Sequence, residues 1–228
     1  MDIVKTGSLA DYVFETLENE ILSGKYPIGE ILTELSISKR LNVSRTPVRE
    51  AIRRLQQENL VKEAGKGVKV VGISADDLED IFEIRSRIEG LAAKKCAEKI
   101  TDDQIDELYQ IVELQEFYTT KGIADSIKNI DTEFHKKIYE VCGSDVYSSM
   151  LSDLHKKIQK FRKISVEDNK RANLAHLEHK EIFKAIKSKN GDLAEKLTVE
   201  HIINAKNNIL NSIISEEQNG TYVSSKNH

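Results

Sequence analysis

The sequence predicts a mainly α-helical protein, in which an N-terminal winged helix-turn-helix precedes a C-terminal antiparallel all-α bundle. Three observations predict this class: apolar residues recur at helical spacing over most of the 228 residues, only two prolines occur, and the strand-like residues form one short hairpin. We expect domains at residues 1–73 and 74–215 and a flexible tail at 216–228.

The N-terminal part reads as three helices followed by a wing. Residues 9–22 carry apolar side chains in an i, i+4 series, namely Leu9, Val13, Leu17 and Ile21. Thr33 can cap a short second helix that ends near Leu41, and Asn42-Val43 turns directly into the third helix. Two helices joined by so tight a turn form a helix-turn-helix. The runs 60–64 and 68–71 around Gly65-Lys66-Gly67 predict the hairpin.

The third helix, residues 44–55, has two chemically different sides. Val48, Ala51, Ile52 and Leu55 form an apolar stripe, and Arg45, Arg49 and Arg53 step along another side. Ser44 suits the N-cap, where its hydroxyl can accept from a first-turn N–H group, and Pro47 is tolerated in that turn. This helix is therefore expected to dock by one side and to present guanidinium groups on the other.

Positive charge is concentrated in this region, although the formal net charge of the chain is −4. From Lys39 to Arg54 there are six cations and one anion, Glu50. A focused basic patch on an acidic protein favours DNA binding over a general affinity for nucleic acid. The alternative is an ordinary solvated helix face.

An α-helix fits the major groove, where arginine can donate twice to guanine. We expect base or near-base contacts from Arg45 and Arg49, and a phosphate contact from Thr46 with the helix N-terminus. Arg53, Lys39 and Arg40 either meet the DNA backbone or stay solvated. Further contacts are expected from the wing, where Lys66 adds charge and Gly67 allows close approach to a minor groove.

The C-terminal part keeps a helical period to about residue 214. Six helices are predicted, at roughly 75–98, 102–118, 122–141, 144–163, 170–188 and 191–213. No run of about 18 apolar residues occurs and the N-terminus lacks a signal-like apolar region, so we expect a cytoplasmic protein without a membrane span. Cys96 and Cys142 are expected to be reduced core thiols.

Three predicted helices direct potential metal ligands inward. Asp131 and His135 lie one turn apart on the apolar side of one helix, His179 belongs to an apolar stripe, and His201 lies one turn after Leu197. One carboxylate and three imidazoles suit a divalent metal, with Zn²⁺ first and Ni²⁺, Mn²⁺ or Fe²⁺ as alternatives. Taken singly, each histidine also fits an ordinary core position. His176 is a rival to His179, and His155 is assigned to solvent or core.

These motifs together resemble the GntR transcription regulators, in the FadR branch with an FCD effector domain. The resemblance is carried by residues 44–52, the Lys66-Gly67 wing, and residues 83–92, 131–135 and 178–201. The six-helix count is closer to the VanR-like members. At position 35 this chain has Leu35, where the fatty-acid-responsive member of the family has an arginine. More of the discrimination between DNA sequences is therefore expected from Arg45, Arg49 and the wing.

The resemblance implies a homodimer that binds a two-fold symmetric DNA operator and responds to a small carboxylate. It implies the metal set Asp131, His135, His179 and His201, and it favours His179 over His176. Arg85 is the expected carboxylate partner, with a weaker candidate in Arg162; the alternative for Arg85 is an exposed salt bridge to Glu89.

The expected function is thus a ligand-controlled transcription regulator, most simply a repressor, and not an enzyme. Two alternatives stay open: a metal-dependent hydrolase, for which no general-base or nucleophile motif is visible, and a metal that only clamps the bundle.

Overall fold

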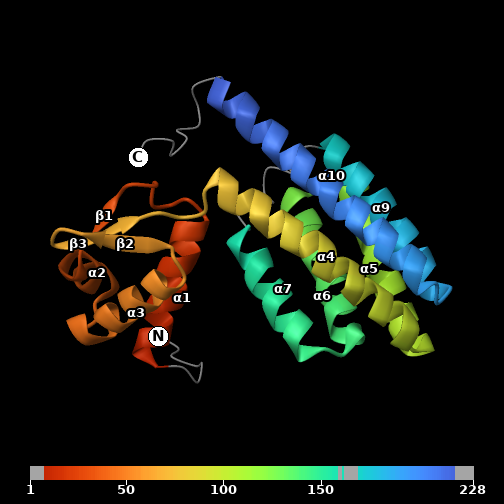
Figure 1. The fold of residues 1–228 in the computed structure, drawn as a ribbon, viewed down its shortest axis with the longest axis horizontal. Helices are drawn as coiled ribbons and strands as arrows, with labels where there is room; N and C mark the ends of the chain where they lie inside the picture. The colour runs from red at the N-terminus through yellow and green to blue at the C-terminus, as the bar shows by residue number, and fades with distance from the viewer. Residues whose placement is uncertain (1–7, 159–160, 162–168, 219–228) are drawn as a thin grey trace. The chain divides into compact units, whose positions relative to one another are not determined.

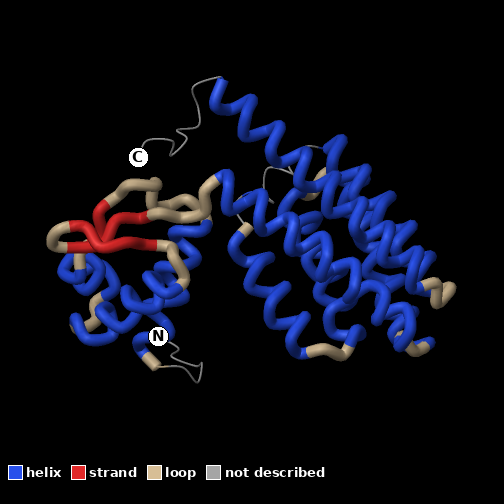
Figure 2. Tube along the Cα trace, viewed as in Figure 1, coloured by secondary structure: helices blue, strands red, loops and turns tan. Residues whose placement is uncertain are grey.

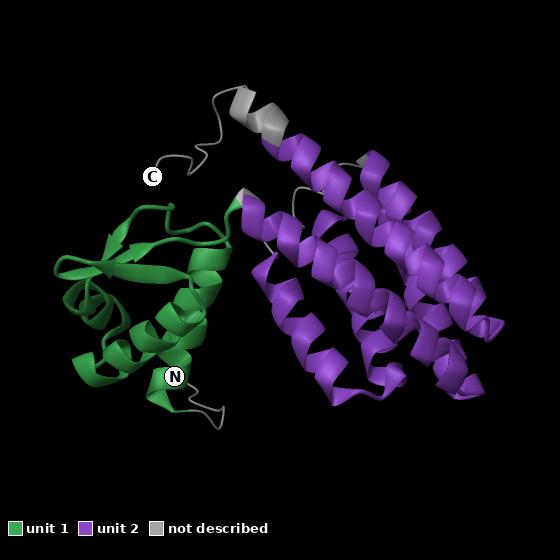
Figure 3. Cartoon of the chain, in the orientation of Figure 1, with its two compact units in different colours: residues 1–74, 225–228 green, residues 75–224 purple. Residues whose placement is uncertain are grey.

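The computed structural model describes residues 8–158, 161 and 169–218. The chain divides into two compact units, with the boundary in the sequence between Ser74 and Ala75, and each unit is described by itself (Figure 3). Helix is the main secondary structure in both units, and the strands described belong to the N-terminal one (Figure 2). The mainly helical class predicted from the sequence is confirmed, with a winged helix-turn-helix followed by a helical bundle.

The N-terminal unit contains the helices α1 (Leu9–Leu22), α2 (Glu34–Leu41) and α3 (Arg45–Gln57) (Figure 1). Capping explains where the first two begin, because the hydroxyls of Ser8 and Thr33 accept from backbone N–H groups in the first turn. α2 stops at Asn42, whose φ of 52° is left-handed, and the chain turns at once into α3. The predicted helix-turn-helix is present.

A three-stranded antiparallel sheet completes this unit. Its strands β1 (Ile31–Leu32), β2 (Val61–Ala64) and β3 (Gly67–Val70) are ordered β1-β3-β2, with Leu32 opposite Val68 and Val61 opposite Val70. The hairpin of β2 and β3 is the wing that the sequence predicted. β1 was not predicted, since two residues are too few to show the alternation that identifies a strand.

The stripes of α1 and α3 supply the core of the N-terminal unit. α1 packs against α3, and the buried residues include Val13, Leu17, Val48, Ala51, Leu55, Leu60 and Val70. All four apolar positions predicted for α3 are buried, so its arginine side is left at the surface. The core thus orients the helix that the sequence assigned to DNA.

The C-terminal unit is a helical bundle. Its fully described helices are α4 (Ala75–Lys99), α5 (Asp102–Lys121), α6 (Ala124–Cys142), α7 (Asp145–Lys157), α9 (Asn169–Lys187) and α10 (Gly191–Gln218). Short turns at Gly122 and Gly143, both with positive φ, let successive helices fold back on each other. α7 ends at Lys157, before the predicted residue 163, and α10 continues through residues 216–218, which had been expected as tail.

The longest helices, α4 and α10, lie side by side (Figure 1). Gly90 makes their close approach possible, because a Cβ at this position would lie 2.9 Å from Val199 Cγ2. All described helices of this unit contribute buried apolar residues, among them Phe134, Ile138, Leu151, Ile182 and Ile209.

Both cysteines, Cys96 and Cys142, are free and buried, and burial raises the pKa of the Cys96 thiol to about 12. They are inert core thiols in this arrangement. Within the described ranges, no helix has the length and apolar character needed to cross a membrane.

Candidate functional site

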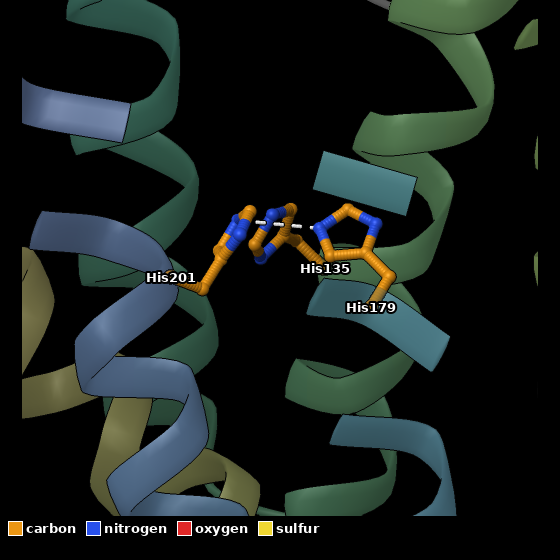
Figure 4. A group of neighbouring side chains, drawn as sticks. All are labelled: His135, His179 and His201. Carbon is orange, nitrogen blue, oxygen red and sulfur yellow. Dashed lines mark hydrogen bonds between the residues drawn. The ribbon is translucent and has the colours of Figure 1, made fainter. Parts of the chain in front are cut away.

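Three histidines from three helices meet inside the bundle. His135 of α6, His179 of α9 and His201 of α10 are all buried, with ring centroids 4.5–5.2 Å apart. Figure 4 shows the three imidazoles turned toward one another, with His179 Nε2 only 3.2 Å from His201 Nε2. The fold therefore collects residues that are 22 to 66 positions apart in sequence into one group of nitrogen ligands.

The outer nitrogen of each ring faces an oxygen. His179 Nδ1 donates to Gln115 Oε1 at 2.8 Å and His201 Nδ1 donates to Glu178 Oε2 at 2.7 Å. His135 Nδ1 lies 3.0 Å from Glu89 Oε2. These oxygens can only accept, so the proton of a neutral ring sits on Nδ1 and the lone pair on Nε2. Such outer partners are typical of metal-ligating histidines.

The surroundings keep two of the rings neutral. Burial, reinforced by the neighbouring His201, holds the pKa of His179 well below its usual 6.5. Burial also lowers the pKa of His201, although Glu178 acts in the opposite direction. Two lone pairs at 3.2 Å repel unless a cation lies between them, so neutral imidazoles in this geometry fit a divalent metal.

Asp131 lies beside the cluster without joining it closely. Its Oδ1 is 3.7 Å from His179 Nε2, and its side chain is 14% exposed. His176, the rival considered for His179, is buried near Glu116 with its Nε2 3.7 Å from that carboxylate, and it does not belong to the histidine group. The structure thus brings together His135, His179 and His201, with Asp131 at the edge.

Arg85 is buried and paired with Glu89, where the alternative reading expected an exposed salt bridge. Arg85 Nε donates to Glu89 Oε1 at 2.7 Å and its Nη2 donates to His155 Nε2 at 2.8 Å. Glu89, His135 and His155 also lie close enough together to hold an ion. The fixed guanidinium already neutralises Glu89, so this second group is a network that orients His135 and disfavours a cation.

A cavity of about 50 Å³ adjoins the histidines. Its wall includes His135, His201, Asp131, Gln115 and two buried arginines, Arg85 and Arg171. Arg171 donates to both oxygens of Glu178, at 3.1 and 2.8 Å, and this bidentate pair with the His201 bond holds the pKa of Glu178 at about 2 against the effect of burial. Arg162, the weaker effector candidate, lies outside the described residues.

On the N-terminal unit, α3 exposes the side expected to meet DNA. Arg45 and Arg49 share one carboxylate, Glu34 of α2, while Thr46 and Arg53 are exposed. Ser44 occupies the N-cap position as predicted, but its side chain makes no capping hydrogen bond, so that expectation is wrong. The hydroxyl leaves the first-turn N–H groups of α3 to other acceptors, such as a phosphate.

Among the other cations of the predicted patch, some are exposed and others are paired with carboxylates of the N-terminal unit. Lys39 of α2 and Lys66 of the wing are exposed, as a DNA contact requires. Arg40 is exposed, but it donates to both oxygens of Glu20 at 2.8 and 2.6 Å and is therefore already paired within the N-terminal unit. Arg54 likewise donates to Asp11. These two arginines stabilise the N-terminal unit itself.

Comparisons with known proteins agree on one family. The model of the FCD domain matches residues 80–204, and that of the bacterial regulatory proteins of the gntR family matches residues 9–70. The chain belongs to the GntR family, with an FCD domain. The relatives that it matches are transcription regulators rather than enzymes, and the GntR–FCD chain is therefore a DNA-binding transcription regulator.

Individual relatives cover most of the GntR–FCD chain. The HTH-type transcriptional repressor RspR of Escherichia coli is 26% identical, over 83% of this chain and 84% of the repressor. The Uxu operon regulator of Haemophilus influenzae is 31% identical, over 84% and 78% of the two chains. The solved structure of E. coli McbR/YncC covers 91% of this chain and 99% of its own with a TM-score of 0.73 and 21% identity, which supports the fold.

Gly67 has a packing role in the GntR–FCD chain that the sequence did not predict. A Cβ at Gly67 would lie 2.3 Å from the backbone oxygen of Leu32, so this glycine is needed for β1 to pair with β3. Gly65, with a φ of +56° and open space around it, is the glycine that the turn itself requires. This packing requirement for a glycine at position 67 does not depend on any contact with DNA.

Four residues with clear roles in the site escaped the sequence reading: Gln115, Glu178, Arg171 and Glu34. Gln115, Glu178 and Glu34 contact histidines or arginines of another helix, and periodicity within one helix does not reveal such contacts. Arg171 pairs with Glu178 two turns away on the same helix, α9. The signal that was available was weak: Gln115 is a polar residue on the inward side of a helix, one turn after Val112 and Ile111.

Proposed function

We propose that this GntR–FCD regulator is a repressor that binds a two-fold symmetric operator as a homodimer, and that a divalent metal with a small carboxylate controls its DNA affinity. Its similarity to the repressor RspR supports the direction of control. Dimers of helix-turn-helix proteins bind DNA sites with matching two-fold symmetry, which supports a two-fold symmetric operator as the DNA partner of a homodimer.

The observation that carries the metal is the orientation of the three histidines. His179 and His201 donate from Nδ1 to Gln115 and Glu178, and His135 Nδ1 faces Glu89. Nitrogen atoms of the three rings lie within 4.8 Å of one another. Asp131, whose Oδ1 is 3.7 Å from His179 Nε2 at the edge of the cluster, is the carboxylate that we propose as the fourth ligand. Ligands of this kind suit Zn²⁺ first, and also Ni²⁺, Mn²⁺ or Fe²⁺, and they offer no thiolate.

The walls of the adjoining cavity support a small carboxylate as the effector. Arg85 and Arg171 both line it, and a guanidinium group binds a carboxylate in bidentate fashion. Gln115 Oε1 accepts from His179 Nδ1, and the buried Nε2 of Gln115 makes no hydrogen bond within the described part of the chain. A donor left in this way suits a ligand oxygen. The cavity has room for a few waters, or for the carboxyl group of a small acid that displaces them.

The control of DNA affinity is tested by a thermal-shift screen. Protein stripped with a chelator is screened against small organic acids with and without Zn²⁺ or Ni²⁺, and an acid that binds the native state raises the melting temperature. Hits are then added to binding assays on a duplex that the protein itself selects from a random pool. We expect metal-dependent hits that change the affinity for this duplex.

Two results would argue against this control. If the metal raises the melting temperature and no acid changes DNA affinity, the metal is only a structural clamp. If neither metal nor acid shifts the melting temperature, the cavity is not an effector site.

The DNA face is tested separately, on the N-terminal unit. Arg45, Thr46, Arg49 and Arg53 of α3, Lys39 of α2, and Lys66 with Gly67 of the wing are the proposed contacts. Replacing Arg49 with alanine should weaken binding to the selected duplex by about 5- to 150-fold, the loss of a bidentate base contact. An unchanged affinity at moderate salt would remove Arg49 from the reading face. Sedimentation of the protein and of its DNA complex tests the dimer.

A further inference from the structure

One carboxylate on α2 holds the two arginines assigned to reading DNA. Glu34 Oε2 accepts from Arg45 Nε and Nη2 at 3.1 and 2.8 Å. Glu34 Oε1 accepts from Arg49 Nε at 3.0 Å, and Oε2 accepts from Arg49 Nη2 at 3.2 Å. Four hydrogen bonds therefore converge on a single side chain from two arginines that lie one helical turn apart.

The geometry of these bonds leaves part of each arginine for a ligand. Both guanidinium groups use their Nε–Nη2 edge for Glu34, so Nη1 is turned away from the carboxylate. The side chains of Arg45 and Arg49 are 60% and 67% exposed, whereas that of Glu34 is only 26% exposed. The carboxylate thus lies beneath the arginines and does not cover them.

The charges explain why the arrangement persists. Two arginines at i, i+4 repel each other, and Glu34 between them removes that repulsion. The hydrogen bonds from Arg49 and Arg45 hold the pKa of Glu34 at about 2, so the carboxylate stays ionised at any physiological pH. Two cations against one anion still leave a net positive charge at the surface of α3.

A carboxylate binds an arginine in much the same way as a DNA phosphate does. Contacts to phosphate carry no sequence information, and they dominate binding to DNA of any sequence. An arginine whose Nε–Nη2 edge is already taken loses part of its capacity for phosphate. Its Nη1 end stays available to donate to a base.

We propose that Glu34 is a specificity-determining positioning residue: it occupies the edge of Arg45 and Arg49 that a backbone phosphate would take, and it aims their remaining donors at the bases. This inference rests on the DNA-reading role proposed for Arg45 and Arg49. It predicts that loss of the Glu34 charge strengthens binding to DNA of arbitrary sequence and does not strengthen binding to the operator equally.

The test compares Glu34→Gln with wild type on two duplexes of about 30 base pairs. One is the sequence that wild type enriches from a random pool, and the other is a scrambled version of it. We expect Glu34→Gln to bind the scrambled duplex about fivefold more tightly, as expected for releasing a surface ion pair. Its affinity for the selected duplex should be unchanged or lower, so the ratio of the two affinities falls.

Salt dependence supplies a second readout. In the wild type an incoming phosphate displaces Glu34, whereas in Glu34→Gln the released arginines carry counterions that phosphate binding must expel. The slope of log affinity against log salt for the scrambled duplex should therefore steepen by about one. Glu34→Asp, which keeps the charge at a shorter reach, should restore most of the wild-type preference.

A matched control separates this role from net charge. Glu15→Gln removes an equal charge from an exposed position on α1. Equal gains of Glu34→Gln and Glu15→Gln on both duplexes would overturn the inference. So would a lower melting temperature of Glu34→Gln with parallel losses on both duplexes, which is the signature of a merely structural residue. If Arg49→Ala leaves DNA binding unchanged, the proposed reading role fails instead.

Discussion

His179 Nε2 and His201 Nε2 lie 3.2 Å apart, while the Nδ1 atoms of the two rings point outward to Gln115 and Glu178. Two neutral imidazoles without a proton between them adopt this contact only at a cost, unless a shared cation accepts both lone pairs. The apposition of these two atoms therefore links the buried polar network of the bundle to metal binding.

Replacing either His179 or His201 with alanine should abolish stoichiometric metal binding. We expect His201→Ala and His179→Ala, purified from cells and dialysed without chelator, to contain little Zn²⁺ or Ni²⁺ by elemental analysis. His176→Ala is the matched control, since His176 lies one turn before His179 on α9 but outside the histidine group. It should keep the wild-type content. Equal metal in His201→Ala and wild type would refute the site.

The partners behind the histidines should tune affinity without supplying a ligand atom. Gln115→Leu removes the oxygen that accepts from His179 Nδ1 and so frees the ring to change tautomer. Metal affinity should fall about 10- to 100-fold, measured by competition with a chromogenic chelator. Thr119→Val, one turn later on α5, is the control because Thr119 is also buried and its hydroxyl makes no hydrogen bond among the described residues. A Gln115→Leu variant with wild-type affinity would show that the amide does not position His179.

The residues show where sequence reasoning succeeded and where it stopped. The helix at Leu9 was predicted from its apolar i, i+4 series, the start at Glu34 from the capping residue Thr33, and the buried side of α3 from its periodicity. The histidines were found because each lies on an inward stripe of its own helix. Partners of these residues were not found, since Gln115 and His179 are 64 positions apart and only the packing of α5 against α9 joins them.

Local rules also failed where tertiary structure decides. β1 exists because it pairs with β3, and the sequence of two residues carries no sign of this. Arg40 lies in the basic segment expected to bind DNA, yet its guanidinium group donates to both oxygens of Glu20. Gly67 resembled a wing-tip glycine, and the deciding contact is the backbone of Leu32, which approaches from a distant part of the chain.

Acid should destabilise the metal-free protein through the buried histidines. His179 and His201 have pKa values below 6.5 in the folded state, so the unfolded chain binds their protons first as the pH falls. The free energy of unfolding therefore decreases below pH 6.5 and continues to decrease until the folded-state pKa values are reached. Each group contributes a slope of at most about 1.4 kcal/mol per pH unit.

This dependence is measured by urea unfolding in chelator between pH 7.5 and about 5. His179→Gln removes one of the two groups, and its unfolding free energy should vary less steeply with pH than that of wild type. Identical slopes for the two proteins would mean that His179 is not kept neutral by the fold.

The wing offers a test that separates packing from DNA contact. Gly67→Ala places a Cβ 2.3 Å from the backbone oxygen of Leu32, and a backbone atom cannot yield as a flexible side chain can. We expect the pairing of β1 with β3 to be destabilised by about 1–3 kcal/mol, seen as faster hydrogen exchange of the strand amides. Gly65→Asn is the control, because asparagine tolerates the φ of +56° and a Cβ at this position meets no atom within 4 Å. Its exchange should match wild type within about 0.5 kcal/mol. If Gly67→Ala instead exchanges like wild type and loses affinity for DNA, then Gly67 serves the DNA contact directly and the contact with Leu32 is not what requires a glycine.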